Sequence, residues 1–327
     1  MKLSEIMSRR VLILSGKGGV GKSVVSAALA WKAAQEGKRT LLIEMDTMET
    51  LPRLFGRPGG ERYKEVLLAP NIHCLHVDGK SGLEEYLQLV LKSKTLTQRI
   101  FRSPVYEYFV NVAPGLKELM AVGKIWDLEQ STVPGTSRPK YDLFIVDTPA
   151  TGHALAYLRM PMSAVSTLRR GFVRKEAQKV ADLLQDPGKT SFNIVTTPAE
   201  TPVNEAIELH EEASRQLRLP VGCLFVNQLY PAFFQGPELD RFQLWTSQVE
   251  KDKRESPDSS PALLQESALL RCALSWQRRR ETQEAHLERL RQALPAQMVT
   301  LPLVPAVEDP LSLIQELAGS LQDSVAE

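Results

Sequence analysis

The chain has 327 residues, of which 43% are hydrophobic and 24% charged, a balance expected of a globular protein with a sizeable core. It contains 40 Lys and Arg and 39 Asp and Glu residues, and the net charge of +1 creates no global field that favours nucleic acid or an anionic membrane. Residues 1–10 lack the apolar run of a signal peptide, and no stretch approaches the roughly twenty apolar residues of a membrane span. These features predict a cytoplasmic protein that associates with membranes at most peripherally, through a partner.

The three cysteines, Cys74, Cys223 and Cys272, lie far apart in the sequence and form no Cys-x-x-Cys pair. This spacing predicts neither a disulfide framework nor a zinc site, and we expect no iron–sulfur cluster. A reducing compartment is consistent with this cysteine usage.

Apolar runs typical of buried parallel strands recur along the chain, with helical patterns between them. The expected strands are residues 11–15, 40–45, 72–77, 141–146, 192–196, 222–226 and 298–304. The alternation predicts an α/β fold with a doubly wound, mostly parallel sheet.

Residues 81–140 and 153–189 are longer than simple crossovers require, and both segments carry apolar residues at helical spacing. We expect them to form a helical subdomain inserted in a single domain that spans residues 1–327. Pro161 is expected to break the second segment. The polar stretch 250–261 is expected to be a surface loop.

The first strand leads into Gly16-Lys17-Gly18-Gly19-Val20-Gly21-Lys22-Ser23, which has the spacing of a phosphate-binding loop, and a helical stretch follows. Backbone N–H groups of such a loop converge on a phosphate, and the helix adds the positive end of its dipole. Lys22 would contact the β- and γ-phosphates, and Ser23 would hold Mg²⁺. The predicted nucleotide-binding residues here are Gly16, Gly18, Gly19, Val20, Gly21, Lys22, Ser23 and Val24. The chain is therefore predicted to bind a nucleoside triphosphate.

Lys17 follows the first glycine of this loop, where ordinary phosphate loops have a variable residue. The GKGGVGKS run resembles the deviant Walker A loop of the signal-recognition, Min and arsenite-pump class of nucleotide hydrolases. The resemblance implies that Lys17 crosses a dimer interface to contact the partner's nucleotide. A solvated loop lysine is the alternative, although a cation at this position faces the phosphates.

Asp147 follows the predicted strand 141–146 and begins the run Asp147-Thr148-Pro149-Ala150-Thr151-Gly152-His153. A carboxylate at the end of such a strand can order magnesium-bound water beside the phosphates, so Asp147 is a predicted metal-site residue that acts through water. A capping role is the alternative. The run is similar to the DTAPTGH switch of the arsenite-pump ATPase family, which includes targeting factors for tail-anchored membrane proteins. Alanine and proline are transposed here, while the polar residues match.

The resemblance to this family extends to three further positions. Asp46 matches the aspartate that orients and deprotonates the attacking water, although Thr47 and Met48 replace the family's proline and alanine. Asn227 matches an asparagine that lies against adenine, whose edge an amide can pair with as donor and acceptor. Pro302 lies in a run similar to the segment that packs beside the base. A strand-end carboxylate and a turn-capping amide are the alternatives for the first two.

The resemblance implies a homodimeric Mg-ATPase with ATP and Mg²⁺ as cofactors and with Asp46, Lys17 and Lys22 as catalytic residues. Its nucleotide state would control binding of a protein client, such as a hydrophobic helix, by the helical subdomain. One alternative is a subunit that drives an arsenite or anion pump, for which clustered thiolates are needed. Another is a Min- or Par-like spatial regulator with a basic amphipathic C-terminal helix, but residues 311–327 contain no Lys or Arg.

Overall fold

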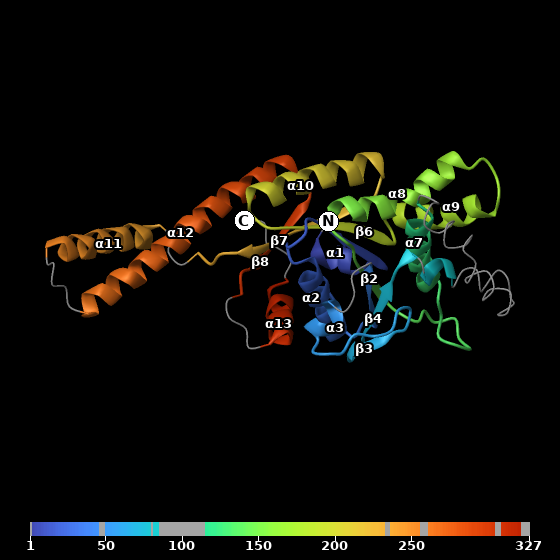
Figure 1. Ribbon diagram of the computed structural model, residues 1–327, viewed down its shortest axis with the longest axis horizontal. Coiled ribbons are helices and arrows are strands. Elements are labelled where there is room, and N and C mark those ends of the chain that lie inside the picture. Colours follow the sequence, from blue (N-terminus) through green and yellow to red (C-terminus); the bar gives the residue numbers. More distant parts are fainter. Residues whose placement is uncertain are drawn as a thin grey trace, which may run out of the picture.

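The computed structural model describes residues 2–45, 50–79, 81–84, 115–232, 236–255, 261–304 and 309–321. At its centre lies one eight-stranded sheet with the order β3-β4-β2-β5-β1-β6-β7-β8 (Figure 1). Neighbouring strands are parallel except β3 and β4, which are antiparallel. The strands are β1 Val11–Ser15, β2 Thr40–Met45, β3 Val66–Ala69, β4 Ile72–Val77, β5 Leu143–Asp147, β6 Thr190–Thr196, β7 Val221–Leu229 and β8 Gln297–Pro302. The predicted α/β fold with a mostly parallel sheet is confirmed.

Helices cover both faces of the sheet. The central strand β1 sends Val11 and Ile13 into one core and Leu12 and Leu14 into the other, which explains why its sequence is continuously apolar. One face carries α1 (Leu3–Met7), α2 (Lys22–Gln35), α3 (Thr50–Leu54) and α13 (Pro310–Ser320). The other carries α7 (Leu116–Glu129), α8 (Thr151–Thr167), α9 (Phe172–Gln185), α10 (Glu200–Glu211) with the π-helical turn η1 (Glu212–Gln216), and the end of α12 (Pro261–Ala293).

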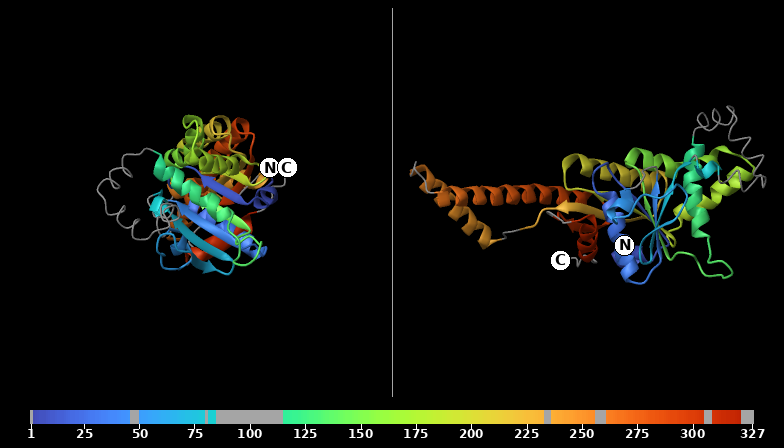
Figure 2. Two further views of the ribbon diagram at one scale, coloured as in Figure 1. Left: turned by 90° about the vertical axis from the view of Figure 1, so that its right-hand side faces the viewer. Right: turned by 60° about the horizontal axis from the view of Figure 1, so that its bottom comes forward.

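Helices α7, α8 and α9 pack against one another at one end of the molecule (Figures 1 and 2). They come from both segments in which the sequence predicts a helical subdomain, and residues 85–114 of the first segment lie outside the described part. Leu119 and Leu158 are buried in this layer, whereas Leu116 and Trp126 are half-buried. Leu158 belongs to the same core as Val11 and Ile13 of β1, so the layer is continuous with the core on this face of the sheet.

Two local expectations are wrong. Pro161 lies inside α8, which continues unbroken to Thr167, because burial of the proline ring with Leu158 offsets the roughly 3 kcal/mol that an interior proline costs. The polar stretch after Glu250 is still helical as far as Glu255, where α11 (Pro237–Glu255) ends. Residues 256–260 of the predicted loop lie outside the described residues, and its last residue, Pro261, begins α12.

Helices α11 and α12 form a hairpin that extends away from the sheet (Figure 2). A small core of Phe242, Val249 and Leu270 holds the two helices together. At its other end, α12 returns to the body of the protein, where Leu287 and Leu290 join the main core. None of the helices in the described ranges combines the length and apolar character needed to cross a membrane.

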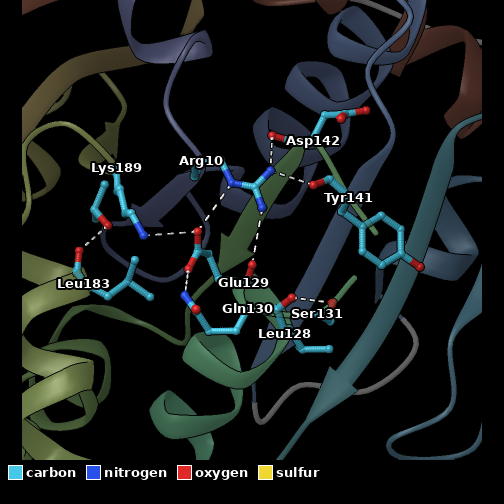
Figure 3. A network of polar contacts seen from close by, with 10 residues as sticks. Arg10, Leu128, Glu129, Gln130, Ser131, Tyr141, Asp142, Leu183 and Lys189 are labelled. Carbon is cyan, nitrogen blue, oxygen red and sulfur yellow. Dashed lines mark hydrogen bonds and ion pairs between the residues drawn. The ribbon is translucent and has the colours of Figure 1, made fainter. Parts of the chain in front are cut away.

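A polar network joins four elements at the amino edge of the sheet (Figure 3). Arg10, just before β1, donates through Nη1 to the carbonyl oxygens of Tyr141 at 2.6 Å and Asp142 at 3.1 Å. The Glu129 carboxylate at the end of α7 accepts from Arg10 Nε at 3.4 Å and lies 3.5 Å from Lys189 Nζ. Because the Glu129 side chain is only 6% exposed, these two cations compensate a nearly buried negative charge.

We expect Glu129→Gln to lower the free energy of unfolding by about 1–3 kcal/mol, because the change leaves two part-buried cations without their carboxylate. Urea unfolding followed by circular dichroism measures the loss. Asp127→Asn on the same helix is the matched control, because Asp127 pairs with Lys124 at an exposed position and such pairs contribute little. Equal stability of the two variants would contradict a structural role for the network.

Candidate functional site

The phosphate-binding loop lies between β1 and α2, at the carboxyl edge of the sheet. β1 has β5 on one side and β6 on the other, and ligands of such sheets bind at the carboxyl ends of central strands. Gly19 and Gly21 have φ angles of 86° and 89°, a region that favours glycine. Gly21 caps α2, and a Cβ there would lie 2.4 Å from the amide nitrogen of Asn227. The loop conformation therefore depends on glycine at these positions.

Lys22, the first residue of α2, folds back over the loop. Its Nζ donates to the carbonyl oxygens of Gly16 at 3.0 Å and Lys17 at 3.1 Å. Burial lowers the pKa of Lys22, while the nearby Asp147 carboxylate opposes this shift. The ammonium group is thus held inside the loop that the sequence assigns to phosphate. Val20 is buried and Val24 packs against the core, so both fix the loop to the sheet.

Ser23 and Asp147 meet although 124 residues separate them. Ser23 Oγ donates to Asp147 Oδ2 at 2.6 Å, and Asp147 is the last residue of β5. Among the described residues, Asp147 Oδ1 is buried without a hydrogen-bond partner. Burial raises the pKa of Asp147 to about 6, although the Ser23 hydroxyl and the Lys22 ammonium lower it. A hydroxyl and a carboxylate with an open acceptor form an oxygen donor set that fits Mg²⁺.

The segment after Asp147 is hydrogen-bonded to the phosphate loop and its strand. Thr148 donates to Leu14 O through its backbone N at 3.2 Å and its Oγ1 at 2.7 Å. Thr151 N donates to Gly16 O at 3.2 Å and begins α8. This hydrogen bond therefore joins the phosphate loop to the first turn of a helix in the α7–α9 layer. Gly152 and His153 lie in that first turn and are exposed.

Asn227 comes from β7, which pairs with β6, and Pro302 comes from the edge strand β8, which pairs with β7. Asn227 is buried near the end of β7, and its Nδ2 donates to Val20 O at 3.0 Å. Pro302 ends β8 opposite Leu229, two residues after Asn227. The structure thus places the Asn227 amide against the phosphate loop. Contact of Asn227 and Pro302 with a base stays a prediction.

Lys17 forms an ion pair with Glu205 on α10, with Nζ and Oε1 2.6 Å apart. Glu205 is a neighbour of the loop that the sequence does not reveal. Its partner lies 188 residues away, so no local pattern identifies it. Lys17 itself is positioned on the side of the loop that faces α10.

Asp46 lies outside the described residues, which stop at Met45 and resume at Thr50. Beside this gap the structure shows a further carboxylate, that of Glu44, which was not among the residues predicted from the sequence. Glu44 is buried at the end of β2, and its Oε1 accepts from the backbone N of Thr50 at 2.8 Å and Leu51 at 3.2 Å. A charged residue inside an otherwise apolar strand was the available signal. Glu44 fixes the start of α3 where the chain leaves the segment that contains Asp46.

Comparisons with known proteins agree with this geometry. Residues 9–177, which include the phosphate loop and Asp147, match the model of the anion-transporting ATPase family. The chain is 30% identical over 244 residues to a putative ATPase of Mycobacterium bovis, covering 72% of this chain and 70% of that protein. It is 28% identical over 257 residues to a putative arsenical pump-driving ATPase of Halobacterium salinarum, covering 72% and 39% respectively. It is 26% identical over 275 residues to ATPase GET3B of Arabidopsis thaliana, covering 68% and 65%. The phosphate loop follows the central strand, Asp147 accepts from the loop's Ser23, and the family match covers more than half of the chain. This protein therefore belongs to the anion-transporting ATPase family and is an ATPase.

Proposed function

We propose that the protein is a Mg-dependent homodimeric switch whose nucleotide state controls binding of a protein client by helices α7, α8 and α9. The observation that carries this proposal is the connection at Thr151, whose backbone N–H is bonded to Gly16 O while the residue begins α8. A rearrangement around the γ-phosphate therefore moves a helix of the layer without an intervening loop.

The proposed hydrolysis uses residues that the phosphate loop and its neighbours supply. Lys22 and the loop amides bind the β- and γ-phosphates, and Asp46 orients and deprotonates the attacking water. Ser23 would hold Mg²⁺ directly and Asp147 through water, and bound Mg²⁺ would supply positive charge beside the transferred phosphoryl group. Lys17 of the partner subunit would complete this charge stabilisation, as an arginine finger does in other phosphate-loop enzymes.

An apolar cavity marks the side of the helical layer that we assign to the client. Its volume is about 270 Å³, and its lining includes Leu116, Met120, Trp126, Val173 and Val180 from α7 and α9. Within the described ranges, the side chains of α7 and α9 leave this space unfilled, as expected where an apolar partner docks. The resemblance to tail-anchor targeting ATPases supports a hydrophobic helix as the client.

A metalloid-activated pump subunit is less consistent with the positions of the cysteines. Cys74 lies on β4 and Cys223 on β7, with four strands between them. Since neighbouring strands are about 4.8 Å apart, these two positions are separated by roughly 24 Å. Cys272 is exposed on α12. Burial also raises the pKa of Cys74, which keeps its thiol protonated. One subunit therefore cannot gather its three cysteines around one metalloid.

The test is light scattering of the full chain with ADP or with a non-hydrolysable ATP analogue, each with Mg²⁺, together with a dye that reports exposed apolar surface. We expect both the dimer and the stronger dye signal in the samples with the analogue, and neither in the samples with ADP. Met120→Ser in the cavity should reduce the dye signal without preventing dimerisation. A monomer under both conditions would contradict the homodimer. A dimer without a nucleotide-dependent apolar surface would contradict the client site.

A further inference from the structure

Lys17 is held within its own subunit at two points. Its ammonium contacts the Glu205 carboxylate at 2.6 Å, and its backbone oxygen accepts from Lys22 Nζ at 3.1 Å. Glu205 is firmly placed because Val203 and Ala206, on either side of it in α10, are buried in the main core. The ion pair thus joins a rigid helix to the phosphate loop.

The contact with Glu205 competes with the role proposed for Lys17 at the partner's nucleotide. A lysine ammonium is a compact point charge, and one that contacts Glu205 in its own subunit cannot at the same time reach across a dimer interface. The polyphosphate of a partner carries several negative charges and Glu205 carries one, so the phosphates attract Lys17 more strongly once they are within reach. Without a partner's phosphates, Lys17 stays paired with the Glu205 carboxylate.

We propose that Glu205 is a positioning residue that holds Lys17 in its own subunit until a partner's nucleotide competes for it, and so raises the subunit concentration at which ATP turnover begins. This inference rests on the proposed homodimeric function. The side chains of Lys17 and Glu205 are each 34% exposed, so the effect is that of a solvent-screened ion pair, about two- to fivefold in an equilibrium constant.

The experiment measures ATPase activity per subunit as the subunit concentration is raised, for the full chain and for Glu205→Gln. We expect the half-maximal concentration of Glu205→Gln to be about 4- to 25-fold lower, since closure of the symmetric dimer no longer breaks two ion pairs, each of which contributes about two- to fivefold. Plateau turnover and nucleotide affinity at low subunit concentration should equal those of the unmodified chain. The difference in half-maximal concentration should shrink in 0.5 M salt, which screens the pair.

Glu208→Gln is the matched control, because Glu208 is exposed on the same helix, close to one turn from Glu205. Glu205→Asp keeps the charge and should behave more like the unmodified chain than Glu205→Gln does. Melting curves of the variants establish that α10 is folded. The role of Glu205 is overturned, and the homodimeric function is not, if Glu205→Gln and Glu208→Gln give identical curves of activity against subunit concentration. A lower plateau turnover for Glu205→Gln has the same meaning. Activity per subunit that does not change with concentration in any of the proteins overturns the homodimeric function and this role together.

Discussion

Lys17→Ala is expected to lower ATP turnover by about 10³-fold or more while leaving nucleotide affinity close to that of the unmodified chain. The phosphate loop keeps Lys22, its amides and the amino end of α2, so binding in the same subunit loses little. Charge stabilisation of the transferred phosphoryl group in the partner is lost. Single-turnover hydrolysis and a fluorescent-nucleotide titration separate the two quantities. Lys175→Ala, at an exposed position of α9, is the control.

Mixing variants shows whether Lys17 acts across the interface. A subunit with Lys17→Ala keeps Asp46, and a partner with Asp46→Asn keeps Lys17, so one complete site forms in each mixed dimer. At equal amounts, half of the dimers are mixed and each has one competent site, which restores about a quarter of the unmodified activity. No recovery on mixing, or an equal loss of affinity and turnover in Lys17→Ala, would place the action of Lys17 in its own subunit.

Asp147→Asn is expected to stabilise the folded chain in the absence of nucleotide and to abolish Mg-dependent hydrolysis. The ordinary pKa of an aspartate is 3.8, and burial, which penalises the charged form, raises the pKa of Asp147 to about 6 in the folded state. Between these values the folded chain holds a proton that the unfolded chain has lost, so the stability of the unmodified protein falls as pH rises through this window. At pH 7.5 the neutral amide avoids a penalty of about 3 kcal/mol.

Urea unfolding at pH 4 and pH 7.5 measures the effect of Asp147→Asn on stability. The advantage of the variant should be small at pH 4 and reach its full size at pH 7.5. Asp142→Asn is a control of opposite sign near the start of β5, because hydrogen bonds from Arg39 lower the pKa of Asp142. If the variant is no more stable than the unmodified chain at pH 7.5, burial of the charged Asp147 carboxylate does not destabilise the folded protein. Mg-dependent hydrolysis by the unmodified protein should decline as pH falls through about 6, where Asp147 takes up a proton.

The features that could be predicted from the sequence are local ones. Buried parallel strands need continuous apolar runs, and the phosphate loop needs glycines at left-handed positions, so both leave a pattern within a few residues. The loop at Gly16 to Ser23 and the strand that ends at Asp147 were therefore predicted at nearly their observed bounds. The edge strand β3 was not predicted, because its four residues carry little pattern and its pairing with β4 is antiparallel.

Contacts between residues distant in sequence, and the tolerance of unfavourable residues, depend on how the elements pack in three dimensions. Ser23 meets Asp147 across 124 residues and Lys17 meets Glu205 across 188, and such pairs follow from strand order rather than from any local spacing. Pro161 remains helical because the surrounding layer buries it, a packing energy that its neighbours in sequence do not reveal. A local sequence pattern therefore predicts where phosphate would bind, while the packing of α10 and β5 around the loop places Glu205 beside its Lys17 and Asp147 beside its Ser23.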